Sequence, residues 1–136
     1  MEAFYDLVKR LVKGFEVAGV DYVFTGALAA SFYGAPRTTG DVDVVVAVAG
    51  VKQRVRLVEA LKRAGTVAGL SCFYQTPEEL ILAKLRMIKA TKPRERALKD
   101  EEDVKAILRF TEVDMDGVRQ KSRKDSTFSI LEEILK

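Results

Sequence analysis

One short stretch constrains the fold more than any other part of the chain. It is Asp41–Val48, DVDVVVAV, and its run of β-branched residues favours an extended strand. From Val44 to Val48 every position is apolar, whereas a strand with one face in water would alternate apolar and polar residues. The pattern predicts a strand that is covered on both faces and lies centrally in a sheet with helices packed against it.

The rest of the sequence supplies both strands and helices. Two further strands are expected, over 21–25 (DYVFT) and 70–74 (LSCFY). Helical spacing of apolar residues, ended by glycine or proline, predicts helices over 2–18, 27–33, 51–64 (ended by Gly65), 77–90, 99–110, 115–121 and 128–135. Strands gather in the first half and helices in the second. This order favours an α+β (mixed α/β) fold, a small mixed sheet flanked by helices and followed by a helical C-terminal half.

The length of 136 residues predicts one domain over 1–136, with a core of about 20–110 and C-terminal helices over about 111–136. No apolar run is long enough to cross a bilayer, and the first residues lack the pattern of a signal peptide, so we expect a cytoplasmic location. The chain has no Asn and is rich in Lys, Arg and Glu, a composition typical of thermophiles.

Composition excludes several kinds of chemistry. The chain has no His and a single Cys, Cys72, which excludes His-based catalysis, an intramolecular disulfide and a cysteine zinc cluster. A bound metal would therefore need oxygen ligands, which favours magnesium, manganese or calcium. The net charge of +3 and pI of about 9.0 suit an anionic partner such as a nucleotide or a nucleic acid.

Two carboxylates stand at the start of the predicted central strand. Side chains alternate along a strand, so Asp41 and Asp43 would share a face, with Cα atoms roughly 6.5 Å apart. Two carboxylates this close repel each other, and a divalent cation between them would relieve the repulsion. Mg²⁺ typically binds through one or two carboxylates together with phosphate oxygens. The pair predicts a metal site of the kind used in phosphoryl or nucleotidyl transfer.

A glycine turn precedes this pair. Gly26 follows a predicted strand and opens a predicted helix, where the absence of a side chain lets a phosphate approach the backbone and the helix N-terminus offers N–H groups. Arg37 and Thr38 stand shortly before the carboxylates. Arginine can hold a phosphate with two parallel hydrogen bonds, and threonine can donate its hydroxyl. Together these residues predict a phosphate site.

The stretch YVFTGALAASFYGAPRTTGDVDVVV resembles the nucleotidyltransferase superfamily built on the polymerase-β-like minimal fold. It is most similar to small bacterial and archaeal proteins related to the toxins of abortive-infection toxin–antitoxin systems. Those proteins share a small-residue turn, a short helix, an Arg-x-Thr and an Asp-x-Asp strand. The segments TPEELILAKLRM and PRERALKDEEDVKAIL also resemble that group, through Lys84 and through Arg96, Lys99, Asp100 and Asp103. The resemblance covers roughly residues 20–110.

The resemblance implies a reaction and a set of site residues. Asp41 and Asp43 would be the catalytic residues and would hold Mg²⁺ or Mn²⁺. An acceptor hydroxyl would attack the α-phosphate of an NTP, and pyrophosphate would leave. The nucleotide would be bound by Thr25, Gly26, Ala27, Arg37, Thr38 and Lys84. The acceptor, whether protein, RNA or small molecule, is not identified by the sequence.

The sequence departs from the family pattern at two points. Ala27 stands where the family often has Gly or Ser, so a hydroxyl is lost. Active members also carry a third carboxylate on a following strand, whereas the stretch from Gly65 to Gln75 has no acid. An alternative function is therefore a catalytically degenerate nucleotide-binding or toxin–antitoxin-type component that acts through a helical protein partner.

A second alternative is a nucleic-acid-binding module. Seven basic residues lie between positions 84 and 99, at 84, 86, 89, 92, 94, 96 and 99, with Glu95 as the one acid in that stretch, and such a surface can contact phosphates. A solvated helix face is the simpler interpretation for most of them.

Purely structural interpretations apply to the other motifs as well. Asp41 could begin a strand, Asp43 could protect a sheet edge, and the segment containing Arg37 and Thr38 could be a solvated turn. The acids 100–103 suit the first turn of a helix, where they complement its dipole. Asp114 is predicted to cap the helix that comes after it.

Overall fold

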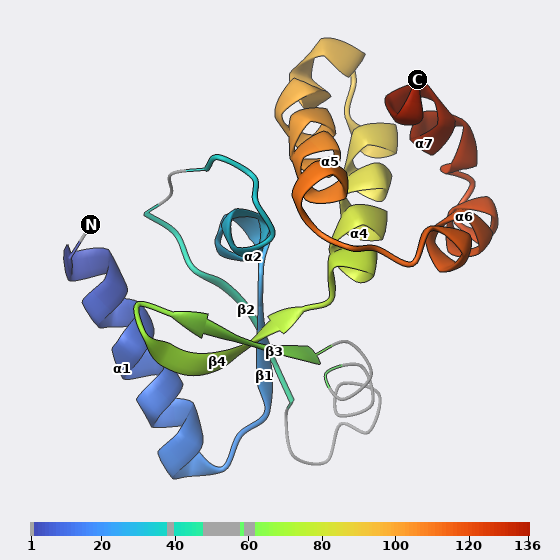
Figure 1. The fold of residues 1–136 in the computed structure, drawn as a ribbon. Coiled ribbons are helices and arrows are strands. Elements are labelled where there is room, and N and C mark those ends of the chain that lie inside the picture. Colours follow the sequence, from blue (N-terminus) through green and yellow to red (C-terminus); the bar gives the residue numbers. More distant parts are fainter. Residues whose placement is uncertain (1, 38–39, 48–57, 59–61) are drawn as a thin grey trace. The chain divides into compact units, whose positions relative to one another are not determined.

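The computed structural model describes residues 2–37, 40–47, 58 and 62–136. Within them the contacts divide the chain into two compact units (Figure 1). Unit 1 comprises Met1–Ala29 and Thr38–Thr76, and unit 2 comprises Ala30–Arg37 and Pro77–Lys136. The chain passes from one unit to the other inside helix α2 (Gly26–Phe32), again after Arg37, and again after Thr76. The single domain expected from chain length stays a prediction.

Unit 1 is built on a four-stranded mixed sheet. Its strands are β1 (Tyr22–Thr25), β2 (Asp43–Val46), β3 (Lys62–Val67) and β4 (Leu70–Gln75), in the spatial order β2-β1-β4-β3. β1 is antiparallel to β2 and parallel to β4, and β3 is antiparallel to β4. This arrangement confirms the predicted α+β fold with a small mixed sheet.

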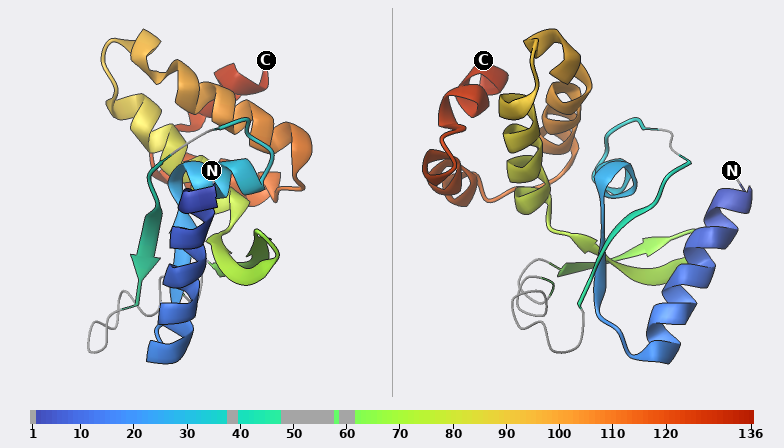
Figure 2. Two further views of the ribbon diagram at one scale, coloured as in Figure 1. Left: turned by 90° about the vertical axis from the view of Figure 1, so that its left-hand side faces the viewer. Right: turned by 180° about the vertical axis from the view of Figure 1, so that it is seen from behind.

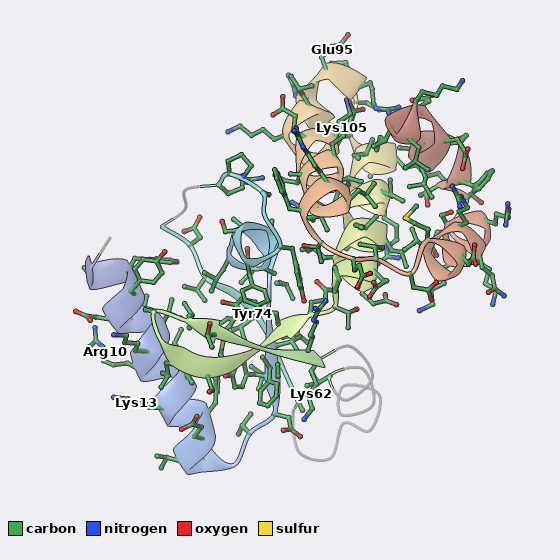
Figure 3. The ribbon with its side chains drawn as sticks, in the orientation of Figure 1. Arg10, Lys13, Lys62, Tyr74, Glu95 and Lys105 are labelled. Carbon is green, nitrogen blue, oxygen red and sulfur yellow. The ribbon has the colours of Figure 1, made fainter. Side chains whose placement is uncertain are left out.

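Helix α1 (Glu2–Ala18) packs along this sheet (Figures 1 and 2). Its buried stripe includes Val8 and Val12, and its Phe15 ring stacks on Tyr22 of β1 at 4.7 Å between ring centres. The opposite face carries Arg10 and Lys13, which point away from the sheet (Figure 3). The helix has the bounds that its apolar spacing predicts, because its single apolar stripe has one face to bury.

The prediction of the central strand is wrong in its bounds and in its position. The Asp41–Val48 stretch was expected to be a central strand, but β2 covers only Asp43–Val46 and is the outermost described strand on its side of the sheet. Its valines are half-buried rather than buried, and the central strands are β1 and β4. A continuous apolar run therefore reflects β-propensity here, not coverage of both faces.

The predicted helix over 51–64 is also wrong at its end. Residues 62–64 begin strand β3, and Gly65 lies inside that strand opposite Cys72 rather than ending a helix. The two-residue turn Ala68-Gly69, with φ of 48° and 81°, joins β3 to β4 in a hairpin. Val58 has helical backbone and is fully buried. The remainder of the prediction, 51–57 and 59–61, lies outside the described residues.

Burial of the Tyr22 side chain gives a testable pH dependence. Loss of hydration on burial is the main cause that raises the pKa of Tyr22 from 10.0 to about 12, with a smaller contribution from Cys72. Because the folded state favours the neutral phenol, this residue contributes stability below pH 10 that is lost between pH 10 and about 12. An absorbance titration at 295 nm of the wild type minus Tyr22→Phe should show a midpoint near 12, and a midpoint near 10 would contradict this assignment.

Unit 2 is helical. Besides the end of α2, its elements are α4 (Pro77–Ala90), the 3-10 turn η1 (Arg94–Ala97), α5 (Leu98–Phe110), α6 (Met115–Lys124) and α7 (Phe128–Leu135). α4 and α5 lie side by side, and α6 and α7 pack against α4 (Figures 1 and 2). These helices confirm the predicted helical C-terminal half.

Helix α6 begins at the cap that the sequence predicts. Asp114 Oδ1 accepts a hydrogen bond from the Gly117 N–H at 3.1 Å, so the aspartate satisfies one of the free N–H groups in the first turn of the helix.

The helices also bear on the question of a membrane span. None of the helices in the described residues combines the length and the apolarity that a membrane-spanning helix requires.

Candidate functional site

The glycine turn and one of the predicted carboxylates meet at one end of the sheet in unit 1. β1 and β2 are paired so that Thr25 lies opposite Asp43, and Gly26 follows Thr25 directly. A Cβ built on Gly26 would overlap Asp43 Oδ2 and lie 3.0 Å from its Cγ. Gly26 also has a φ of +61°, which L-residues with side chains rarely adopt. Both the space and the backbone at this position therefore require glycine.

The other predicted residues of this turn have different positions. Ala27 is the second residue of α2 and is half-buried, like Thr25 and Gly26. The N-terminus of this helix was expected to form an anion site, but α2 is only seven residues long. The close approach of Gly26 to Asp43 therefore supports a site at this turn better than the short helix does. Thr38, the predicted hydroxyl donor, lies outside the described residues.

Asp41 is not part of the strand that was expected to carry it. β2 begins at Asp43, so Asp41 lies two residues before it and is exposed. The alternation argument therefore does not extend to Asp41, and the pairing of Asp41 with Asp43 stays a prediction. Asp43 is also exposed, at the first position of β2.

The donor set fits Mg²⁺ bound together with phosphate better than a metal bound by protein alone. Within the described part of the chain there is no group of three or more His, Cys, Asp or Glu side chains arranged to hold a metal. Two carboxylates completed by substrate oxygens are a usual arrangement for Mg²⁺. On the other side of β1, Tyr74 of β4 lies opposite Phe24 and β4 ends at Gln75, so this neighbouring strand supplies no third carboxylate.

Unit 2 contains four charged side chains that are linked by ion pairs. We call them the ion cluster: Arg37, Lys84, Asp100 and Asp103. Asp103 Oδ2 accepts a hydrogen bond from Arg37 Nη1 and lies 2.9 Å from Lys84 Nζ. Lys84 Nζ also donates to Asp100 Oδ1 at 3.1 Å. Two positive and two negative groups thus balance one another.

Burial differs strongly within the ion cluster. The Asp103 and Lys84 side chains are 3% and 8% exposed, whereas those of Asp100 and Arg37 are 18% and 28% exposed. Buried charges are tolerated when they are paired and hydrogen-bonded. In the described residues every buried side-chain nitrogen or oxygen has a hydrogen-bond partner. Asp103, bonded to both cations, is central to this arrangement.

The ion cluster decides between the alternatives left open for three residues. Arg37 is not in a simple solvated turn, because its guanidinium is bonded to buried Asp103. Lys84 is not on a solvated helix face. Asp100 lies in the first turn of α5, as expected, and also pairs with Lys84. The sequence assigned Asp103 no task of its own, although residues 100 and 103 are three apart and so share one helix face.

Several of the basic residues between 84 and 99 are already paired. Arg86 bonds Asp125 at 2.7 Å, and Arg94 bonds Glu101 at 2.6 Å and Glu133 at 3.0 Å. The other four basic residues of the stretch are exposed: Lys89, Lys92, Arg96 and Lys99. These pairs reduce the basic surface on which the nucleic-acid-binding interpretation depends, and that interpretation stays a prediction.

A comparison with solved structures gives an informative likeness. No known protein-family profile matches the sequence, and no curated protein matches it. The structure is similar to the crystal structure of an antigenic nucleotidyltransferase-like protein from Paracoccidioides brasiliensis, with a TM-score of 0.59 and 12% sequence identity. The likeness covers 93% of this chain and 92% of that one. At this identity it shows the fold alone, and the chain therefore has a nucleotidyltransferase-like fold.

Proposed function

We propose that the protein is a Mg²⁺-dependent nucleotidyltransferase-like protein that binds an NTP and transfers its nucleotidyl group to an acceptor. One observation carries the proposal. Gly26, with its positive φ, packs directly against the Asp43 carboxylate where β1 and β2 pair. A carboxylate held against a glycine turn at the end of a strand is a candidate ligand for a divalent metal. The shared fold with a nucleotidyltransferase-like protein supports the same function.

In this proposal each residue has a distinct task. Asp41 and Asp43 would hold Mg²⁺ or Mn²⁺, and the bound ion supplies positive charge that offsets the triphosphate. Gly26, with Thr25 and Ala27 beside it, would contribute backbone N–H groups to phosphate oxygens. The resemblance implies that the side chains of Arg37, Thr38 and Lys84 are further hydrogen-bond donors to the nucleotide. The acceptor hydroxyl would bond to the α-phosphorus as the bond to pyrophosphate breaks.

Manganese binding tests the role of the carboxylates. In the presence of a non-hydrolysable NTP, wild-type protein should remove Mn²⁺ from the free pool measured by electron paramagnetic resonance, beyond what the nucleotide removes alone. The double variant Asp41→Asn, Asp43→Asn should lose that additional binding, because it removes both anionic ligands. The matched control is Asp116→Asn. Asp116 is an exposed aspartate on α6, and with Asp114 it forms another Asp-x-Asp sequence. Equal Mn²⁺ binding by wild type and the double variant would contradict the proposal.

A second candidate function is favoured by the acid-free strand β4. Nucleotidyl transfer with two metal ions uses metal ligands in addition to Asp41 and Asp43. β4, the neighbour of β1, offers no carboxylate that could be one. The second candidate is a nucleotide-binding protein without transfer activity that works through a partner, in the manner of a toxin–antitoxin component. Pyrophosphate release from an NTP separates the two candidates, because transfer releases one pyrophosphate for each nucleotidyl group and binding releases none.

A further inference from the structure

The segment that carries Arg37 is fixed to α5 at several points, all within unit 2. Thr111 Oγ1, just after α5, donates to the Tyr33 carbonyl at 2.7 Å. Gly34 lies against Phe110, because a Cβ on Gly34 would come within 3.1 Å of the Phe110 Cγ. At the end of the segment, Ser31 Oγ donates to the Arg37 carbonyl at 3.1 Å. The backbone that carries Arg37 therefore has a defined position relative to α5.

Asp103 fixes the other end of the same side chain. Its Oδ2 accepts from Arg37 Nη1, and the same oxygen lies 2.9 Å from Lys84 Nζ. Lys84 is held in turn by Asp100. Arg37 is the most exposed member of the ion cluster, and Asp103 is the most buried. A guanidinium has five N–H donors in one plane, so a bond at Nη1, together with the anchored backbone, restricts the directions in which the others can point.

We propose that Asp103 is a positioning residue that orients the Arg37 guanidinium for a phosphate oxyanion, while Lys84 serves as the buried counter-charge of Asp103. This inference rests on the proposed function, and it changes the role of Lys84. With 8% of its side chain exposed and two carboxylates bonded to it, Lys84 stabilises the aspartates rather than touching the ligand. Asp103 would act through Arg37 without contacting the anion.

A double-mutant cycle tests this, with inorganic tripolyphosphate and Mg²⁺ as the calorimetric probe. Arg37→Ala should weaken binding about tenfold to a hundredfold, since it removes charge-assisted hydrogen bonds. Asp103→Asn alone should weaken binding about tenfold by misorienting the guanidinium. In the Arg37→Ala background, Asp103→Asn should change the affinity by less than about twofold. Equal effects of Asp103→Asn in both backgrounds, as a merely structural role gives, would overturn the inference.

Two further measurements keep the outcomes separate. Asp125→Asn, which breaks the Arg86 pair of unit 2, is the matched control and should leave tripolyphosphate affinity unchanged. Wild type that binds no tripolyphosphate would overturn the proposed function.

The orientation of Arg37 is measured independently of ligand by ¹⁵N NMR of the wild type, which also covers the case in which Asp103→Asn does not fold. Separate, slowly exchanging Nη resonances are expected for Arg37, and one averaged resonance would overturn the inference.

Discussion

Replacing Asp103 by Ala is expected to lower the free energy of unfolding by about 3–5 kcal/mol. Asp103 is bonded to both Arg37 and Lys84, so its removal takes this carboxylate from Arg37 and leaves Lys84 paired with Asp100 alone. Lys84 is buried and would lose one of the two carboxylates that neutralise its charge. Urea denaturation followed by far-UV circular dichroism measures the loss, and hydrogen exchange of the α4 and α5 amides should locate it in unit 2.

The matched control for this prediction is Asp125→Ala. It also removes one carboxylate from an ion pair in unit 2, with Arg86 at 2.7 Å, but half of the Arg86 side chain is exposed. An exposed pair of this kind contributes about 0–1 kcal/mol. If both variants lost the same small amount of stability, the ion cluster would have no special structural role, and the central position of Asp103 would have no energetic consequence.

Replacing Gly26 by Ala is expected to impair ligand binding strongly. The added Cβ would overlap Asp43 Oδ2, so the carboxylate must rotate away or β1 must shift. The positive φ of +61° adds strain of about 1–2 kcal/mol for a residue with a side chain. We expect Mg²⁺-dependent binding of a non-hydrolysable NTP to weaken by about tenfold or more, since small misplacements of a binding group have large effects.

Gly19→Ala separates the effect of strain from the effect on Asp43. Gly19 has nearly the same φ, +64°, but a Cβ there would meet nothing within 4 Å. Gly19→Ala should therefore show in thermal unfolding the loss of stability that strain alone causes, and Gly26→Ala should show that loss plus the cost of moving Asp43. Only Gly26→Ala should lose nucleotide affinity. Unchanged affinity in Gly26→Ala would show that the packing of Gly26 on Asp43 has no part in binding.

The helices were largely predictable because their signals are local. α1 and α7 have the bounds that their apolar spacing predicts, and the start of α4 is indicated by Thr76-Pro77. The position of a strand within a sheet is not a local property. The valines of β2 have high strand propensity at an edge as well as at a centre, and β3 depends on a hairpin turn at Ala68-Gly69 whose first residue is not a typical turn former.

The candidate site was predictable in its composition and less so in its arrangement. The motif singled out Gly26, Asp43, Arg37 and Lys84, but not the contact of Gly26 with Asp43, which needs the pairing of β1 with β2. The bond between Arg37 and Asp103 joins residues 66 positions apart. No periodicity in a single sequence indicates such a pair, so the central role of Asp103 became visible only in the folded chain.

Calorimetric titration of the wild-type chain with a non-hydrolysable NTP, once with Mg²⁺ and once with the metal chelated, tests the central claim most directly. The claim is that Asp43, beside the Gly26 turn, belongs to a metal-dependent triphosphate site. We predict saturable binding with Mg²⁺ that is lost on chelation and lost in Asp43→Asn. Absence of binding with Mg²⁺, or binding of equal strength with and without the metal, would contradict it.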